Sequence, residues 1–212
     1  MRKGGRFPFL EQLWRANEGL AFVEFAFAAP IFFTLVLGGI EITNLTIAHL
    51  RVSQIAMTVA DNAGRVTSGI DEANVYEVFA GGELIGEALN FTENGRIVLS
   101  SLEDNRLNGS RAGQQIRWQR CWGELDVESR YGSQGDGSRD SSLANGMGAD
   151  GNRIAAMKET AVMFVEVTYD YQPIVGMGFF DPPQIRYESA FNVRGRQNNA
   201  LSNTQNLRTL NC

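Results

Sequence analysis

One apolar segment near the start of the chain constrains the fold more than any other feature. From Leu20 to Ile40 the sequence reads LAFVEFAFAAPIFFTLVLGGI, and Glu24 is its one charged residue. A helix of this length extends about 31 Å, which matches the hydrocarbon core of a bilayer. The sequence therefore predicts a membrane-spanning helix over residues 20–40.

Basic residues flank this segment on one side. Arg2, Lys3, Arg6 and Arg15 precede it, whereas the next Lys or Arg after it is Arg51. Cytoplasmic flanks of membrane helices are enriched in basic residues. We therefore expect a single pass, with the N-terminus in the cytoplasm and the rest of the chain outside it.

Two other interpretations of the segment are a cleaved secretory signal and a plain signal anchor. Ala26-Phe27-Ala28 has the small-x-small form of a secretory cleavage site, but the most apolar stretch, Ile31 to Leu37, follows that site instead of preceding it. A plain signal anchor accounts for the segment except for Gly19, Glu24 and their spacing. Pro30 removes one helical hydrogen bond, and such a proline is often a tolerated kink without a role.

Glu24 requires an explanation, because an ionised carboxylate inside hydrocarbon costs several kcal/mol without a partner. Cleavage after Gly19 would make Leu20 the first residue and Glu24 the fifth, with a new α-amino group about 6 Å along the helix. The amine of a neighbouring chain, displaced by about one turn, would then neutralise the carboxylate.

The same residues resemble a known family. A basic leader ending in Gly19, followed by LAFVEF with Glu24 fifth and Phe25 sixth, resembles the prepilin peptidase site of type IV pilin-like proteins. The wider string, with Pro30 inside it and Gly39-Ile40-Glu41 at its end, is similar to the TadE-like minor pseudopilins of the Flp (tight adherence, Tad) pilus system. A weaker similarity covers VTYDYQP at residues 167–173.

This resemblance implies an inner-membrane protein with a periplasmic domain, processed by an aspartyl prepilin peptidase. Residues 1–19 would be the leader, Gly19 and Leu20 would flank the cut, and Glu24 and Phe25 would set the register of assembly. The implied partners are a major Flp-type pilin, other minor pseudopilins, the inner-membrane assembly platform and the membrane. Flp-type sites usually have Glu-Tyr where this chain has Glu24-Phe25, a difference that favours a minor component. Whether the chain enters an extracellular pilus stays open.

The apolar helix is predicted to continue beyond the membrane as a stalk to about Gly64, so that the transmembrane and stalk helix covers residues 20–64. Steps of three and four residues predict one buried stripe along it. The stripe consists of Leu45, Ala48, Val52, Ile55, Val59 and Ala63. His49 lies off the stripe, as expected of a solvated or interfacial residue and not of a metal ligand.

An α+β domain is expected from residue 65 to 212. A second helix, capped by Ser68 or Asp71 and bent or interrupted at Gly81-Gly82, precedes four segments of strand character. These segments are 96–102, 115–122, 161–171 and 184–194. The last two alternate in hydrophobicity and predict an antiparallel pair with one face on the stalk helix and the other toward water. The fold class is therefore a long N-terminal helix packed on a small antiparallel sheet, as in pilins.

Three segments of the domain read as loops or surface. Residues 123–152 are rich in Gly, Ser and Asp and predict a mobile loop, where Asp136, Asp140, Asp150 and Asn152 offer oxygen ligands for calcium without EF-hand spacing. The polar tail from Gln197, after Arg194-Gly195-Arg196, reads as a flexible surface terminus. The apolar connection 174–180 is either an exposed partner site or folded into the core.

Composition excludes several functions. A net charge of −5 with two lysines argues against nucleic-acid binding. One histidine, His49, and two cysteines, Cys121 and Cys212, are too few for a zinc cluster, and a single histidine argues against a Ser/His/Asp set, so no metal, cofactor or enzymatic activity is expected. An even cysteine pair outside the cytoplasm predicts a Cys121–Cys212 disulfide.

The sequence thus predicts a minor pseudopilin-like structural protein for assembly of a Flp/Tad-type pilus. The alternative is a membrane-anchored periplasmic adhesin or sensor that is neither cleaved nor assembled into a filament. A type II secretion pseudopilin is an alternative closer to the main hypothesis, but such proteins usually have a shorter leader and Phe directly after the cut. A carboxylate-based hydrolase is a further alternative, but no pair of Asp or Glu residues in this sequence has a distinctive spacing.

Overall fold

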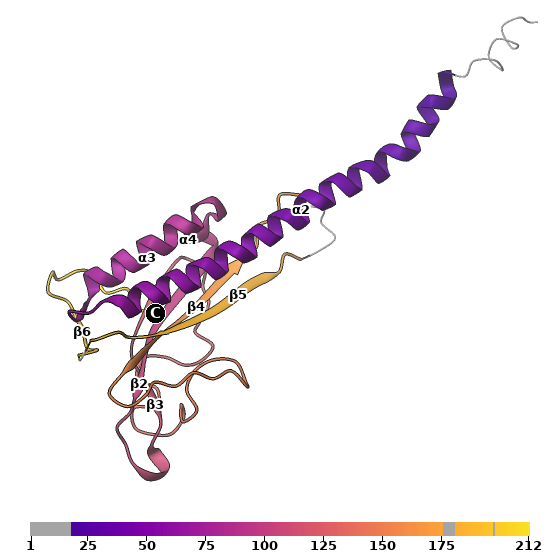
Figure 1. Cartoon of the computed structure of the whole chain (residues 1–212). Helices are drawn as coiled ribbons and strands as arrows, with labels where there is room; N and C mark the ends of the chain where they lie inside the picture. The colour runs from indigo at the N-terminus through magenta and orange to yellow at the C-terminus, as the bar shows by residue number, and fades with distance from the viewer. Residues whose placement is uncertain (1–17, 176–180, 197) are drawn as a thin grey trace, which may run out of the picture.

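A 48-residue helix, α2, carries the domain at one end and projects freely at the other (Figure 1). The computed structural model describes residues 18–175, 181–196 and 198–212. In chain order its main elements are α2 (Glu18–Arg65), β1 (Ile70–Asp71), α3 (Glu72–Gly86), α4 (Phe91–Asn94), β2 (Gly95–Asp104), β3 (Gln114–Trp122), β4 (Ala161–Asp170), β5 (Gln184–Asn192) and β6 (Leu201–Ser202). Short 3₁₀ turns cover Glu87–Leu89 and Gly109–Arg111.

The four long strands form one antiparallel sheet in the order β3-β2-β4-β5. The register pairs Val165 of β4 with Leu99 of β2 and with Ser189 of β5. A β-bulge between Ser101 and Leu102 interrupts the pairing of β2 with β3. All four predicted strand segments are confirmed, and so is the α+β arrangement of a long helix on a small antiparallel sheet.

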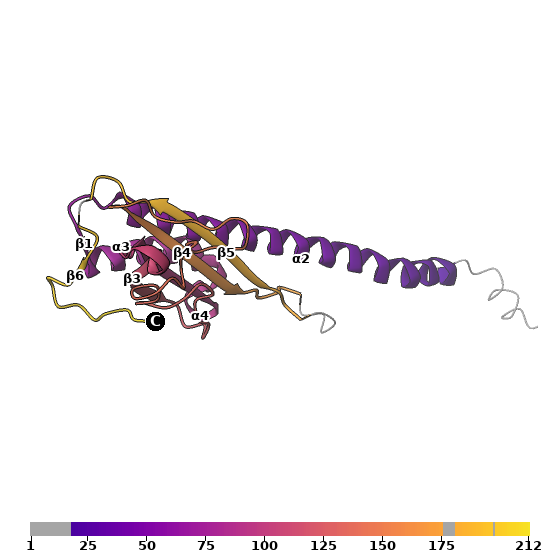
Figure 2. The ribbon, with the colours of Figure 1, turned by 90° about the horizontal axis from the view of Figure 1, so that it is seen from below.

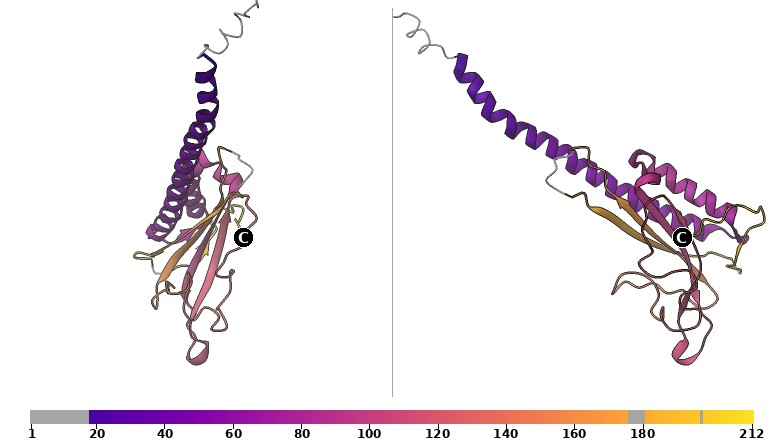
Figure 3. Two further views of the ribbon diagram at one scale, coloured as in Figure 1. Left: turned by 90° about the vertical axis from the view of Figure 1, so that its right-hand side faces the viewer. Right: turned by 180° about the vertical axis from the view of Figure 1, so that it is seen from behind.

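The helices cover one face of this sheet, as the left-hand view of Figure 3 shows. The predicted stripe of α2 is buried there from Ala48 to Ala63, with Leu45 packed at its edge. The facing side chains, four in β4 and one directly after it, are those that alternation placed on one side: Met163, Val165, Val167, Tyr169 and Tyr171. Apolar periodicity therefore identified the main core correctly. His49, off the stripe, is half-buried with Nδ1 3.3 Å from Tyr187 Oη.

Helix α3 lies beside α2 and begins at the predicted cap. Asp71 accepts a hydrogen bond from the Ala73 amide, and Asn74 reciprocates by accepting from the Asp71 amide. The expected break at Gly81-Gly82 is wrong, because the helix continues to Gly86. A Cβ at Gly82 would come within 2.9 Å of Val59 Cγ2, so glycine at this position allows α2 and α3 to approach closely.

The other face of the sheet is not open to water, contrary to expectation. A second core of seven residues lies there: Leu102, Ile116, Leu143, Met147, Ala156, Val162 and Phe164. Two of them, Leu143 and Met147, come from the Gly/Ser/Asp-rich segment 123–152, which therefore is not a solvated loop. Because the segment is mostly polar, its sequence did not indicate that these two side chains are buried.

Hydrogen bonds fasten segment 123–152 to the sheet. Gly135 and Asp136 exchange backbone hydrogen bonds with Ile116 at the β3 edge, at 2.8 and 3.0 Å. Glu166 of β4 accepts from Ser129 Oγ (2.5 Å) and from the Arg130 amide (2.8 Å). Burial raises the pKa of Glu166, and these two donors act against that rise. The segment thus covers the sheet edge that would otherwise be exposed.

The polar tail is also fixed, so the expectation of a flexible terminus is wrong. Arg196 is buried, and its guanidinium donates to the Val66 carbonyl (3.2 Å) and to Asn199 Oδ1 (3.0 Å). Further along, β6 pairs in parallel with β1. The Ser202 hydroxyl and the Thr204 amide both donate hydrogen bonds to the Asp71 carboxylate. These bonds, that of Ser202 more than that of Thr204, lower the pKa of Asp71 to about 2.

The end of the tail is joined covalently to the sheet. The predicted disulfide between Cys121 of β3 and Cys212 is confirmed, with an S–S distance of 2.14 Å, and the Cys121 amide donates to the Leu210 carbonyl (2.8 Å). Backbone and covalent links together therefore hold the C-terminus against the β3 edge.

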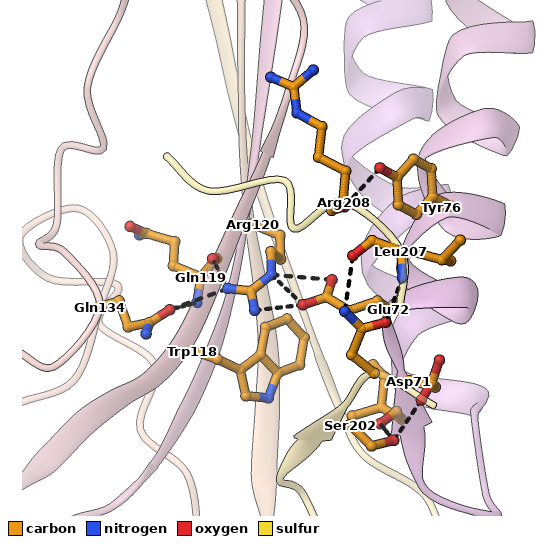
Figure 4. Close-up of polar contacts among 12 residues, drawn as sticks. Asp71, Glu72, Tyr76, Trp118, Gln119, Arg120, Gln134, Ser202, Leu207 and Arg208 are labelled. Atoms are coloured by element: carbon orange, nitrogen blue, oxygen red, sulfur yellow. Dashed lines mark hydrogen bonds and ion pairs between the residues drawn. The ribbon is translucent and has the colours of Figure 1, made fainter. Parts of the chain in front are cut away.

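A buried ion pair lies beneath the tail, between α3 and β3 (Figure 4). The Arg120 guanidinium contacts the Glu72 carboxylate at 2.5 and 2.8 Å, with side chains 10% and 3% exposed. Arg120 also donates to the carbonyl of Gln119 and to Gln134 Oε1 (3.2 Å). The pair therefore joins the helix layer, the sheet and segment 123–152 at one point.

Candidate functional site

The free end of α2, which we call the arm (residues 19–40), is the most unusual surface of the molecule. Its apolar side chains project into solvent, as shown by Phe22 at 75% and Phe27 at 73% exposure. An 18-residue window of this helix has a mean hydropathy of 2.2 and is entirely unburied. Length and composition are therefore consistent with a single-pass membrane anchor.

Two threonine hydroxyls, one in the arm and one just after it, find partners within the helix, as hydrocarbon requires of polar groups. The Thr34 hydroxyl donates to the Pro30 carbonyl one turn earlier, at 2.7 Å, and Thr43 does the same to Gly39 at 2.8 Å. The helix runs without a break through Pro30, and it curves gently along its length (Figures 1 and 3). These hydroxyl groups thus suit a non-aqueous environment.

Gly19 and Leu20, the predicted cleavage residues, lie in the first turn of α2. A Cβ at Gly19 would meet nothing within 4 Å, and Leu20 is 60% exposed. The first amides of a helix lack intrahelical acceptors, so this turn unwinds at low cost. The geometry leaves the Gly19-Leu20 bond accessible to another protein; the predicted leader, apart from Glu18 and Gly19, lies outside the described residues.

Glu24 and Phe25, the predicted assembly residues, project from the arm one turn beyond the cleavage residues. Both are exposed, and none of the ion pairs within the described residues includes Glu24. Residues four apart share a helix face, so Glu24 lies on the side of Leu20. The carboxylate is therefore available to a partner outside this chain.

Where the arm reaches the domain, the Glu41 carboxylate accepts three hydrogen bonds from residues that follow β4. Tyr171 Oη donates to one carboxylate oxygen (2.6 Å), and the amides of Ile174 and Val175 donate to the other (3.1 and 2.9 Å). Asn44 donates to the same phenol oxygen (2.7 Å). Glu41 thus fixes the sheet to the helix at the point where the helix leaves the domain.

Tyr171 keeps its proton in this cluster. Burial, followed by the hydrogen bond to Glu41, raises the pKa of Tyr171 to about 12. The phenol therefore remains a donor to Glu41 throughout the physiological pH range.

The sequence alone did not reveal the role of Glu41. Glu41 ends the family-like string and Tyr171 lies in VTYDYQP, but their contact spans 130 residues of chain. The one available signal was that Glu41 is the first acid after the apolar segment. The connection 174–180 falls mostly outside the described residues; of its members, Ile174 is 65% exposed and Val175 half-buried.

The aspartates suggested as calcium ligands serve the loop itself. Asp136 accepts from the Ser133 amide and Asp140 from the Ser142 amide, while Asp150 pairs with Arg153. Within residues 18–175, 181–196 and 198–212, no group of three His, Cys, Asp or Glu side chains is placed to hold a metal ion. These contacts account for the carboxylates as parts of turns.

Comparison with known proteins finds a family similarity in the arm and stalk. Residues 19–61, all within α2, match the family model of TadE-like proteins. Searches of curated proteins and of solved structures returned no match. The match covers the arm and stalk and ends before β1, so it relates this helix, and not the domain, to TadE-like proteins.

Proposed function

We propose that this chain, a TadE-like protein through its α2 helix, is a minor pseudopilin-like component for assembly of a Flp/Tad pilus, inserted in the inner membrane and cleaved after Gly19. The observation that carries the proposal is the bare arm with Glu24 exposed one turn from Leu20. The four basic residues before the arm support an orientation with the domain in the periplasm. Its partners would be the prepilin peptidase, a major pilin, other minor pseudopilins and the assembly platform.

The proposed mechanism is mechanical. A bilayer stores the apolar arm, and the helices of neighbouring subunits later replace the lipid around it. After cleavage the amine of one chain pairs with Glu24 of another, which sets the axial register of the two helices. A buried ionic group used for register is well attested in helical assemblies. The domain stays outside as a docking or filament surface.

Glu24 variants test the assembly role separately from cleavage. Glu24→Ala should still be cut after Gly19, yet cells should form far fewer pili, because the amine of the neighbouring chain loses its partner. Glu24→Asp keeps the charge with a shorter reach and should give an intermediate number. Electron microscopy counts pili, and immunoblotting of membranes follows cleavage.

Thr34→Val is the matched control, because Thr34 is also a polar residue of the arm but bonds within its own helix. It should leave pilus number unchanged. Normal pili in Glu24→Ala cells would refute the register role. Uncleaved and functional wild-type protein would favour an anchored adhesin or sensor.

A further inference from the structure

We propose that Ile174 inserts into the headgroup region of the bilayer that the arm crosses, so that the domain contacts lipid at a second point. The inference rests on the proposed function in one respect, that the arm lies in a membrane. It concerns a different part of the molecule, the connection that follows β4. Figures 1 and 2 show that β4 ends and β5 begins on the side of the domain from which the arm leaves.

Glu41 fixes the height of Ile174 relative to the membrane. If residues 20–40 fill the hydrocarbon, about 31 Å thick, Glu41 lies at its boundary. Side chains of a helix tilt toward its N-terminus, so the Glu41 carboxylate points back toward the bilayer. The Ile174 amide lies 3.1 Å from that carboxylate and therefore occupies the same level.

The chemistry at this level suits lipid more than water. Ile174 is 65% exposed, and the helix presents two further exposed apolar side chains beside Glu41, Ile40 at 46% and Ile42 at 69%. These continue the lipid-facing surface of the arm without a break in the chain. Exposed apolar groups that gather in this way mark an interaction site. The three donors to Glu41 lower the cost of its partial loss of water.

Two contacts with the bilayer would restrict rotation of the domain about α2. A helix alone leaves that rotation to the interfacial residues around it. With Ile174 held against the lipid, the end of the domain where β4 ends and β5 begins is turned toward the membrane. Neighbouring subunits would then meet the domain in one orientation.

Depth-dependent fluorescence quenching tests the insertion in the full chain. A third cysteine is introduced by Ile174→Cys and labelled with an environment-sensitive dye, the native pair being bonded to each other. The protein is reconstituted in phosphatidylethanolamine–phosphatidylglycerol vesicles, with or without lipids that carry a nitroxide quencher near the headgroup. The label should emit at a shorter wavelength than a label that is exposed to buffer. The nitroxide lipids should strongly reduce its fluorescence intensity.

Met157→Cys is the matched control, since Met157 is equally exposed (66%) and apolar. It lies four residues before β4, whose first residue, Ala161, accepts a hydrogen bond from the Val193 amide; the next amide, Arg194, donates to Gly64, about 35 Å along the helix from Glu41. Nitroxide lipids should leave its label unaffected. Adding Glu41→Gln to Ile174→Cys should weaken quenching, because one carboxylate acceptor of the connection is replaced by a donor.

A label at Phe32→Cys, near the middle of the arm, reports membrane insertion in vesicles whose lipids carry the nitroxide deep in the acyl chain. Quenching at residue 32 without quenching at residue 174 would overturn this inference while leaving the membrane insertion of the proposed function intact. No quenching at either position would overturn both. Shielding of the 174 label by added pilus proteins, but not by lipid, would show that the surface binds protein and would refute the lipid contact.

Discussion

Replacing Cys121 and Cys212 together by serine should lower the free energy of unfolding of the domain by about 4 to 5 kcal/mol. The disulfide joins residues 91 apart, and a closed loop of that length removes this much free energy from the unfolded state in the chain-entropy model. Its loss also frees the tail that packs along β3. Urea unfolding of the full chain in detergent, followed by near-ultraviolet circular dichroism, measures the change.

The single variant Cys121→Ser, which leaves an unpaired Cys212, should lose a similar amount of stability. An unchanged urea midpoint in the double variant would contradict the stabilising role. Two reactive thiols per native chain, found without reducing agent, would contradict the bond itself.

Breaking the buried ion pair from one side should have an effect of similar size. Arg120→Met leaves the Glu72 carboxylate, 3% exposed, without its cationic partner, and should destabilise the domain by about 3 to 5 kcal/mol. The double variant Glu72→Met/Arg120→Met removes both charges and should recover most of that loss. The same urea titration measures both variants.

Arg153→Met provides the comparison at an exposed pair, because Asp150 is 92% exposed. Its cost should stay within about 1 kcal/mol. Equal losses in Arg120→Met and in the double variant would show that the destabilisation does not come from the stranded carboxylate.

Periodicity made the main core predictable. In α2 and β4 the residues of the main core repeat at the spacing of their own element, so the signal is local in the sequence. The same reasoning failed for segment 123–152 and for the tail, where polar residues attach the backbone to a sheet edge at irregular intervals. The anchors Leu143 and Met147 are too few to form a periodic pattern.

The residues of the candidate site also fall into those that local spacing predicts and those that only the fold brings together. Gly19 and Glu24 could be identified as a pair because they lie in one helix, five residues apart, and their predicted roles depend on that spacing alone. The contact of Glu41 with Ile174 joins residues 133 apart, and that of Glu72 with Arg120 residues 48 apart. Only the folded sheet brings those partners together, so no local pattern could indicate them.

The N-terminal residue of the protein isolated from its native membranes tests the central claim most directly. Intact-mass measurement and N-terminal sequencing of the wild type should give a chain that begins at Leu20. Gly19→Val, which adds bulk where a peptidase must approach the backbone closely, should give a chain that retains residues 1–19. Wild-type protein that keeps residues 1–19 in cells with normal pili would contradict the account.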